Sequence, residues 1–351
     1  MIFGKKDHLV GLDIGSSFIK VAEIKVTGKG HVLNKFGMSR ITPGSIVEGR
    51  IVRVEDLAND IKSLFKSQKI REKNVAISTG GHSVVIKTIN TSKKSEKELH
   101  ETIYSEAEQY IPYDINDVNI DYQILGESEF SPDQINVLLV AVKKDLVAEY
   151  IDLIHKAGLS PKIIDVDTFA LQNIYEILPY KNREKITLLI DVGASKTSLN
   201  ILKANISLMM QDNVSGTDQI IEEICDQYDM SIDDAYRAVN GETNTIDQDK
   251  IQEISLKIAQ SWCSEICEAV NTYQSGSNDE KVENVVLSGG GVFVEGFKEG
   301  LMSELDADVS IINPFEALTF NEQKFSDSFI TKASPLAPIA IGLALRRVDD
   351  K

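Results

Sequence analysis

One short pattern occurs twice in this sequence, and it limits the folds that the chain can adopt. The stretches Gly11–Ile24 and Leu189–Leu202 each contain an apolar run, an aspartate, an apolar residue, a glycine, two small residues and a second alternating run. Alternation with a period of two predicts strands, and the glycine predicts the turn between them. We therefore expect two β-hairpins, with Asp13 and Asp191 at the ends of their first strands.

The two hairpins suggest a binding site for a phosphorylated ligand. At a glycine turn the backbone can approach a ligand closely, and a row of N–H groups forms a nest for an anion. An aspartate fixed at a strand end can hold Mg²⁺ directly or through its waters. A single Asp-x-Gly hairpin is often only a turn, but two matched copies predict two half-proteins that close on one Mg²⁺-nucleotide.

Composition excludes some classes of protein. With 351 residues, 42% of them hydrophobic, the chain can build two or more domains or subdomains. Its net charge of −17 disfavours a protein whose main task is to coat DNA or RNA, because phosphate-backbone binding depends on Lys and Arg. We expect no nucleic-acid partner.

The cysteines, histidines and apolar stretches indicate the cellular environment that we expect for the protein. Cys225, Cys263 and Cys267 are too few for a disulfide framework, and the five histidines are scattered. Cys263 and Cys267, both in one expected helix, are more typical of core packing than of a reactive centre. We therefore expect a reduced cytoplasm and no structural zinc. The longest nearly uncharged apolar stretch, 333–345, contains two prolines and is too short to span a membrane. The expectation is a soluble protein that meets a membrane only through a partner.

The first half of the chain alternates strands and helices. After the first hairpin we expect a third strand near Val32–Phe36, a helix over Glu55–Gln68 and a short strand over Asn74–Ser78. A compact module follows, with a hairpin loop over Gly126–Asp133 and with Pro112 ending its first helix. The module's elements are the strand Val84–Ile89, the helix Ser95–Tyr110, the strands Val118–Leu125 and Asn136–Val142, and the helix Lys143–Ala157.

The second half contains two further glycine signals. Gly216 precedes an amphipathic helix, and helix N-termini favour anions. The apolar strand that begins at Asn284 runs into Gly289, Gly290 and Gly291, where bare backbone can lie beside a purine or an α-phosphate. Between them we expect a long helix over Asp249–Tyr273, and the chain closes with an Ala- and Gly-rich helix over Pro335–Arg347 that suits a hinge.

The ordered set of both Asp-x-Gly hairpins, the Thr168–Leu178 helix, the triple glycine and the C-terminal helix resembles the actin, heat-shock chaperone and sugar-kinase ATPase superfamily. The resemblance implies an α/β, actin-like two-domain ATPase fold, a duplicated ribonuclease H-like fold, with an inserted strand-helix-strand-strand subdomain. The insert is similar to those of the cell-division protein FtsA and the type IV pilus assembly protein PilM. The opening Phe3–Ser17 and the segments Glu108–Tyr113 and Asp165–Leu171 look most like the PilM family.

The resemblance also implies a division of the chain. The expected parts are a first-domain core over 1–83 and an inserted subdomain over 84–161, then a return to the first domain with the first connecting helix over 162–187. A second domain over 188–332 and a second connecting helix over 333–351 complete the division.

By the same resemblance, the cofactors are ATP and Mg²⁺, and the protein is a scaffold at the cytoplasmic face of the inner membrane. It would hold the N-terminal cytoplasmic tail of PilN in a groove beside the insert and link other pilus assembly proteins to the motor. Asp13 and Asp191 would surround Mg²⁺. The residues implied at the nucleotide are Gly15, Ser16, Ser17, Lys20, Gly193, Ala194, Ser195, Lys196, Gly216, Gly289, Gly290 and Gly291.

One departure from the superfamily bears on turnover. Chaperone-like relatives carry a catalytic glutamate just before a Pro-Thr pair at the first connecting helix, whereas this chain reads Val166-Asp167-Thr168. Asp165 and Asp167 are the weak candidates for activating water, so we expect slow or no hydrolysis. The alternatives are an FtsA-like division protein, a fast ATPase or sugar kinase, for which no second aspartate base is evident, and an actin-like filament.

Overall fold

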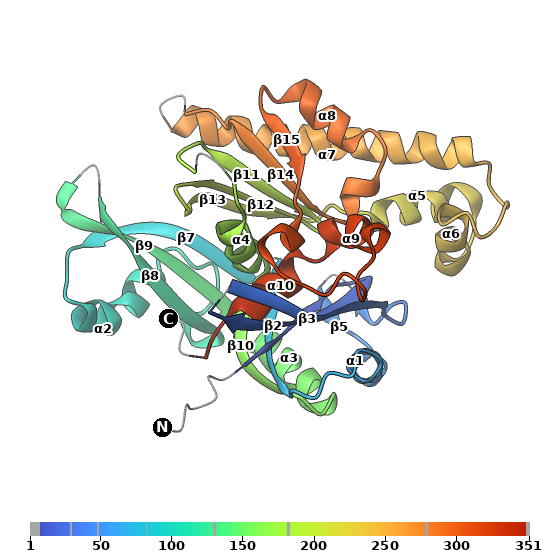
Figure 1. Cartoon of the computed structure of the whole chain (residues 1–351). Helices are drawn as coiled ribbons and strands as arrows, with labels where there is room; N and C mark the ends of the chain where they lie inside the picture. Colours follow the sequence, from blue (N-terminus) through green and yellow to red (C-terminus); the bar gives the residue numbers. More distant parts are fainter. Residues whose placement is uncertain are drawn as a thin grey trace.

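The first domain is built on a five-stranded sheet (Figure 1). The computed structural model describes residues 8–28, 30–47, 49–81, 83–128, 131–180, 183–277 and 280–348, so positions 3–7 of the opening segment Phe3–Ser17 lie outside them. The predicted meander is present as β1 (Val10–Ile14), β2 (Phe18–Thr27) and β3 (Gly30–Arg40), which pair antiparallel. β6 (Asn74–Thr79) lies parallel to β1, and β10 (Ser160–Val166) lies parallel to β6.

The second domain repeats this plan strand for strand. β11 (Thr187–Val192), β12 (Thr197–Lys203) and β13 (Ile206–Asn213) form the antiparallel meander, and β14 (Asn284–Gly289) and β15 (Asp308–Ile311) add in parallel on the other side of β11. The sheet orders β10-β6-β1-β2-β3 and β15-β14-β11-β12-β13 therefore correspond. The prediction of a duplicated fold is confirmed.

Two helices, α4 (Asp167–Ile177) and α10 (Pro338–Leu345), lie between the sheets (Figure 1). They share one buried cluster with residues of both sheets, among them Ile24 and Leu189. Gly342 brings α10 so close to α4 that an added Cβ would lie 1.8 Å from the carbonyl oxygen of Ala170. The predicted final helix is interrupted, because Ser334–Leu336 forms a 3₁₀ turn and Pro338 then starts α10, as proline at a first helical turn does.

Each sheet is covered on its outer face by helices. α1 (Val54–Ser67) and α3 (Lys144–Lys156) cover the first sheet, where Leu57, Ile61, Leu153 and Ile154 are buried together. α5 (Asp218–Tyr228), the 29-residue α7 (Gln248–Gly276) and α8 (Phe297–Glu304) cover the second around Trp262, with α6 (Ile232–Val239) beside them. The shorter elements are β4 (Ile46–Val47), β5 (Arg50–Ile51), α9 (Asp327–Ala333) and the 3₁₀ turns Ile115–Asp117, Gly290–Phe293 and Pro314–Ala317.

The insert forms a third, separate sheet with the order β7-β9-β8. β7 (Val84–Ser92), β8 (Val118–Ser128) and β9 (Ser131–Lys143) are covered on one face by α2 (Glu96–Ala107), which starts with a capping box at Ser95. The loop expected over 126–133 is wrong at both ends, because β8 continues to Ser128 and β9 begins at Ser131, and its residues 129–130 lie outside the described residues. α2 ends at Ala107, before Pro112. α3, which the predicted range 84–161 includes, packs on the first sheet instead.

Among the described residues, no single helix has the length and apolar character needed to cross a membrane, and only the bent pair Asp327–Leu336 and Pro338–Leu345 meets those two criteria together.

Candidate functional site

The turns of the two hairpins face each other across the space between the domains. Gly15 N–H donates to the carbonyl of Phe18 at 3.0 Å, and Gly193 N–H donates to the carbonyl of Lys196 at 2.9 Å, so the two turns are closed in the same way. The hydroxyls of Ser16 and Ser195 lie 2.9 Å apart and join the turns directly.

A cavity of about 240 Å³ lies between these turns. Most of the predicted site residues line it, namely Asp13, Gly15, Ser16, Ser17, Lys20, Asp191, Gly193, Ala194, Ser195, Lys196, Gly289 and Gly290. Gly216 and Gly291 lie behind the lining, because their α-carbons pack against Ala194 and Val192 with no room for a side chain. Ligand pockets usually occupy about 300–1,000 Å³, so this cavity, which we call the cleft, is slightly smaller than the usual range.

Two lysines neutralise part of the negative charge in the cleft. Lys20 pairs with Asp13 at 2.8 Å, and Lys196 pairs with Asp167 at 2.7 Å and with Asp212 at 3.5 Å. Burial alone would lower the pKa values of both lysines, but these carboxylates raise them above the ordinary value. Both ammonium groups therefore remain charged and available to an anion.

The aspartates differ in their partners. Burial raises the pKa of Asp13 although Lys20 opposes it, and burial raises that of Asp191, which has a hydrogen bond with Ser288. Asp191 has no ion-pair partner within 4.0 Å among the described residues. Burial also disfavours the Asp167 carboxylate, but Lys196 and Ser78 more than offset this and hold its pKa below the ordinary value.

The donor set fits Mg²⁺ in one mode of binding. Asp13 and Asp191 both line the cavity, so they could supply two carboxylate ligands. No three His, Cys, Asp or Glu side chains are grouped to hold a metal within the described part of the chain. Mg²⁺ commonly takes one or two carboxylates and completes its shell with water and substrate phosphate.

The two candidate water activators occupy different places. Asp167, at the start of α4, lines the cleft, where it pairs with Lys196 and accepts a hydrogen bond from Ser78 Oγ at 2.5 Å. Asp165 lies outside the cavity lining, is 8% exposed and approaches Arg346 at 3.4 Å. A carboxylate with a lowered pKa and a lysine partner is a weak proton acceptor.

The sequence analysis did not identify three further residues of the cleft lining, Phe18, Arg40 and Tyr236. Arg40, at the end of β3, lies 4.5 Å from the ring centre of Tyr236 on α6 and 5.7 Å from that of Phe18. Burial raises the pKa of Tyr236 to about 12, so its hydroxyl stays protonated, and it donates to Asp218 at 2.7 Å. These contacts join the two domains across the cavity, and no local pattern in the sequence marks them.

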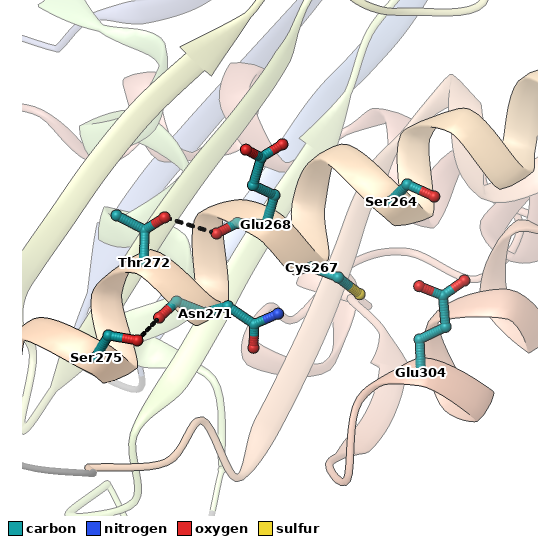
Figure 2. Close-up of a pocket in the computed structure, with 7 residues that line it drawn as sticks. All are labelled: Ser264, Cys267, Glu268, Asn271, Thr272, Ser275 and Glu304. Carbon is teal, nitrogen blue, oxygen red and sulfur yellow. Dashed lines mark hydrogen bonds between the residues drawn. The ribbon is translucent and has the colours of Figure 1, made fainter.

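A second hollow lies on the outer surface of α7 and is lined by small and polar side chains (Figure 2). Figure 2 shows Cys267 pointing toward Glu304 of α8. Burial and this carboxylate raise the pKa of Cys267 to about 12, and burial raises that of Cys263 to about 11. Both thiols stay protonated at neutral pH, so neither is an activated nucleophile.

The model of one protein family, described as type IV pilus assembly protein PilM, matches residues 11–348. The chain belongs to this family. The PilM match extends over both hairpins, the insert and α10, and it favours the pilus interpretation over the FtsA-like alternative.

Solved structures agree with the PilM fold. A structure described as the PilM-PilN type IV pilus biogenesis complex is 24% identical, covers 98% of this chain and 100% of that chain, and has a TM-score of 0.86. The ethanolamine utilization protein EutJ from Carboxydothermus hydrogenoformans is 12% identical over 97% of this chain and 89% of its own, with a TM-score of 0.58. A nucleotide-free diol dehydratase-reactivating factor is 9% identical over 96% of this chain and 99% of its own, with a TM-score of 0.54. The predicted actin-like fold is confirmed.

Proposed function

We propose that this PilM-family protein is a cytoplasmic scaffold of the type IV pilus assembly machinery at the inner membrane. It holds the N-terminal tail of a PilN-type membrane protein, links it to other pilus assembly proteins including the motor, and binds ATP with Mg²⁺ in the cleft. The observation that carries this proposal is the PilM family match over residues 11–348. The similarity along 98% of the chain to a structure described as a PilM-PilN complex supports PilN as the partner.

The inserted sheet offers a place for the tail. A hollow of about 530 Å³ lies between α2, the 3₁₀ turn Ile115–Asp117 and β8, and Tyr104 lines it with 47% of its surface exposed. β8 is an outer strand of its sheet, and an outer strand can pair with an extended peptide. Lys144 of α3 donates to the carbonyl of Asn116 at 2.6 Å, so the hollow lies where the insert meets the first domain.

The cleft supports nucleotide binding through its paired turns and lysines. In this proposal Gly15, Ser16, Ser17 and Lys20 hold one side of the phosphates, and Gly193–Lys196 hold the other. Gly216 and Gly289–Gly291 form the backbone beside the adenosine. Asp13 and Asp191 hold Mg²⁺, which when bound supplies positive charge to the phosphate oxygens. Because Asp167 is paired with Lys196, hydrolysis is slow, and the nucleotide acts mainly by stabilising the folded protein.

The partner is tested with a fluorescent peptide that carries the first residues of the PilN-type protein of the same bacterium, by fluorescence anisotropy. Tyr104→Ala should weaken binding about 5- to 30-fold, since a tyrosine at the centre of an interface often contributes about 1–2 kcal/mol. Tyr228→Ala is the matched control, because Tyr228 is 38% exposed on α5, away from the insert. A wild-type protein that does not bind the peptide would refute the proposed partner.

The nucleotide is tested separately by titration calorimetry with ATP in the presence of Mg²⁺. The wild-type protein should bind, and an absence of heat and of any thermal stabilisation would remove the nucleotide from the proposal. The two experiments are independent, so either half of the proposed function can fail alone.

A further inference from the structure

A chain of three contacts connects the phosphate end of the cleft to the insert. Lys196, in the turn of the second hairpin, pairs with Asp212 of β13 at 3.5 Å. The same carboxylate accepts a hydrogen bond from the backbone N–H of Gly81 at 2.6 Å. Gly81 belongs to the first domain and follows β6, so Asp212 bridges the two domains.

Gly81 lies at the base of the inserted sheet. Its carbonyl accepts the N–H of Val84, the first residue of β7, at 3.0 Å. The carbonyl of Ser83 accepts the N–H of Lys143, the last residue of β9, at 3.2 Å. The position of Gly81 therefore affects the start of one strand of the insert and the end of another.

The Lys196 ammonium group lies in crowded surroundings, close to Gly80 and Asp167. A Cβ on the neighbouring Gly80 would lie 2.0 Å from Lys196 Nζ and 2.7 Å from Asp167 Oδ2, so a side chain at this position would displace the ammonium group. Lys196 is held more closely by Asp167, at 2.7 Å, than by Asp212, at 3.5 Å. The longer contact is the weaker one and is the first to yield when another anion competes for the ammonium group.

We propose that Asp212 couples occupancy of the cleft to the position of the inserted sheet. This inference rests on the proposed function, because it requires a polyphosphate in the cleft. The phosphates draw the Lys196 ammonium group away from Asp212. The Asp212 carboxylate, without its cation, then shifts, and this changes the hydrogen bond that it accepts from the N–H of Gly81. Nucleotide binding thereby alters the base of β7 and β9, and with it the affinity of the insert for its peptide partner.

Thermodynamic linkage makes the coupling reciprocal. If nucleotide changes the affinity for the peptide by some factor, the peptide changes the affinity for nucleotide by the same factor, typically about 5- to 150-fold in coupled systems. Asp212 acts here as a positioning residue, since it lies outside the cavity lining and contacts Lys196, which lines the cleft.

The test compares the full-length wild type with Asp212→Ala, which removes both contacts, and Asp212→Asn, which removes the charge and keeps an acceptor for Gly81. Asp226→Asn is the matched control, because it removes one carboxylate from the exposed surface of α5 in the same domain. Hydrogen-deuterium exchange of β7 and β9 is measured with and without Mg²⁺-ATP, and peptide affinity is measured under the same two conditions.

In the wild type and in Asp226→Asn, nucleotide should change exchange at the start of β7 and the end of β9 and shift peptide affinity at least fivefold. In Asp212→Ala both ligands should still bind, but the shift should fall below about twofold, with Asp212→Asn between the two. ATP binding that leaves exchange and peptide affinity unchanged in the wild type, or an undiminished shift in Asp212→Ala, overturns the coupling and leaves the proposed function intact. Failure of the wild type to bind ATP overturns the coupling together with the nucleotide half of the proposed function.

Discussion

Replacing Gly342 by alanine tests how tightly the two helices between the sheets are packed. The new Cβ would lie 1.8 Å from the carbonyl oxygen of Ala170 and 2.7 Å from its carbon, whereas real Cβ atoms essentially never come closer than 3.0 Å. The clash is with backbone atoms, so no side-chain rotation relieves it. α10 and α4 must therefore move apart to make room for the alanine side chain.

The expected cost follows from two opposing effects. Overpacking a tight core costs about 1–3 kcal/mol, and glycine to alanine in a helix interior recovers roughly 1 kcal/mol. Because the clash is with a backbone carbonyl, we place the overpacking cost at the upper end and expect a net loss of about 2 kcal/mol in the free energy of unfolding. Separation of the helices should also weaken nucleotide binding, since Pro338 of α10 and Asp167 of α4 line the cleft.

Urea denaturation followed by circular dichroism measures the loss. The control is Gly276→Ala in the last turn of α7, where no atom lies within 4 Å of the added Cβ. This variant should be as stable as the wild type or more stable by up to about 1 kcal/mol. If Gly342→Ala unfolds at the same urea concentration as the control, the close crossing does not constrain the two helices.

Three further outcomes are expected. Asp191→Ala should weaken Mg²⁺-dependent ATP binding about 10- to 100-fold in calorimetry, with little change in the presence of EDTA; an unchanged affinity would remove the metal role of Asp191. Steady-state phosphate release should stay below about one per second, at the slow end of enzyme turnover, because the Asp167 carboxylate is paired with Lys196. A faster rate without any partner would refute the scaffold interpretation. Because burial raises the pKa values of Asp13 and Asp191, Mg²⁺ dependence should weaken as pH falls, beginning above the ordinary Asp value of about 3.9, since protonated carboxyls do not hold the cation. Mg²⁺ dependence that stays constant as the pH falls from 7 to about 3.9 would contradict those shifts.

The fold was largely predictable because its signals are local. The Asp-x-Gly hairpins at Asp13 and Asp191 combine strand alternation with a glycine turn, and both properties depend only on neighbouring residues. The structure forms both hairpins in the same register, with Asp13 opposite Lys20 and Asp191 opposite Ser198. Resemblance to a family then supplied the order of the domains, which local patterns alone do not fix.

The errors and omissions arose where distant segments meet. The α3 pattern predicts an amphipathic helix correctly, but the sequence does not say which sheet its apolar face will cover. Arg40 and Tyr236 were missed because their contact joins two segments that lie far apart in the sequence. Asp165 and Asp167 were not separable from sequence, since their different surroundings depend on Arg346 and Lys196 at remote positions.

The two hairpins are alike in backbone but not in the placement of their lysines. In the first, Lys20 stands opposite the aspartate on the neighbouring strand; in the second, that place is taken by Ser198, and the lysine lies two residues earlier, within the turn. Two identical hairpins would bind an elongated anion in either orientation with equal energy. Because the two lysines are placed differently, the two orientations differ in energy, so a duplicated fold can bind an asymmetric ligand in a single orientation.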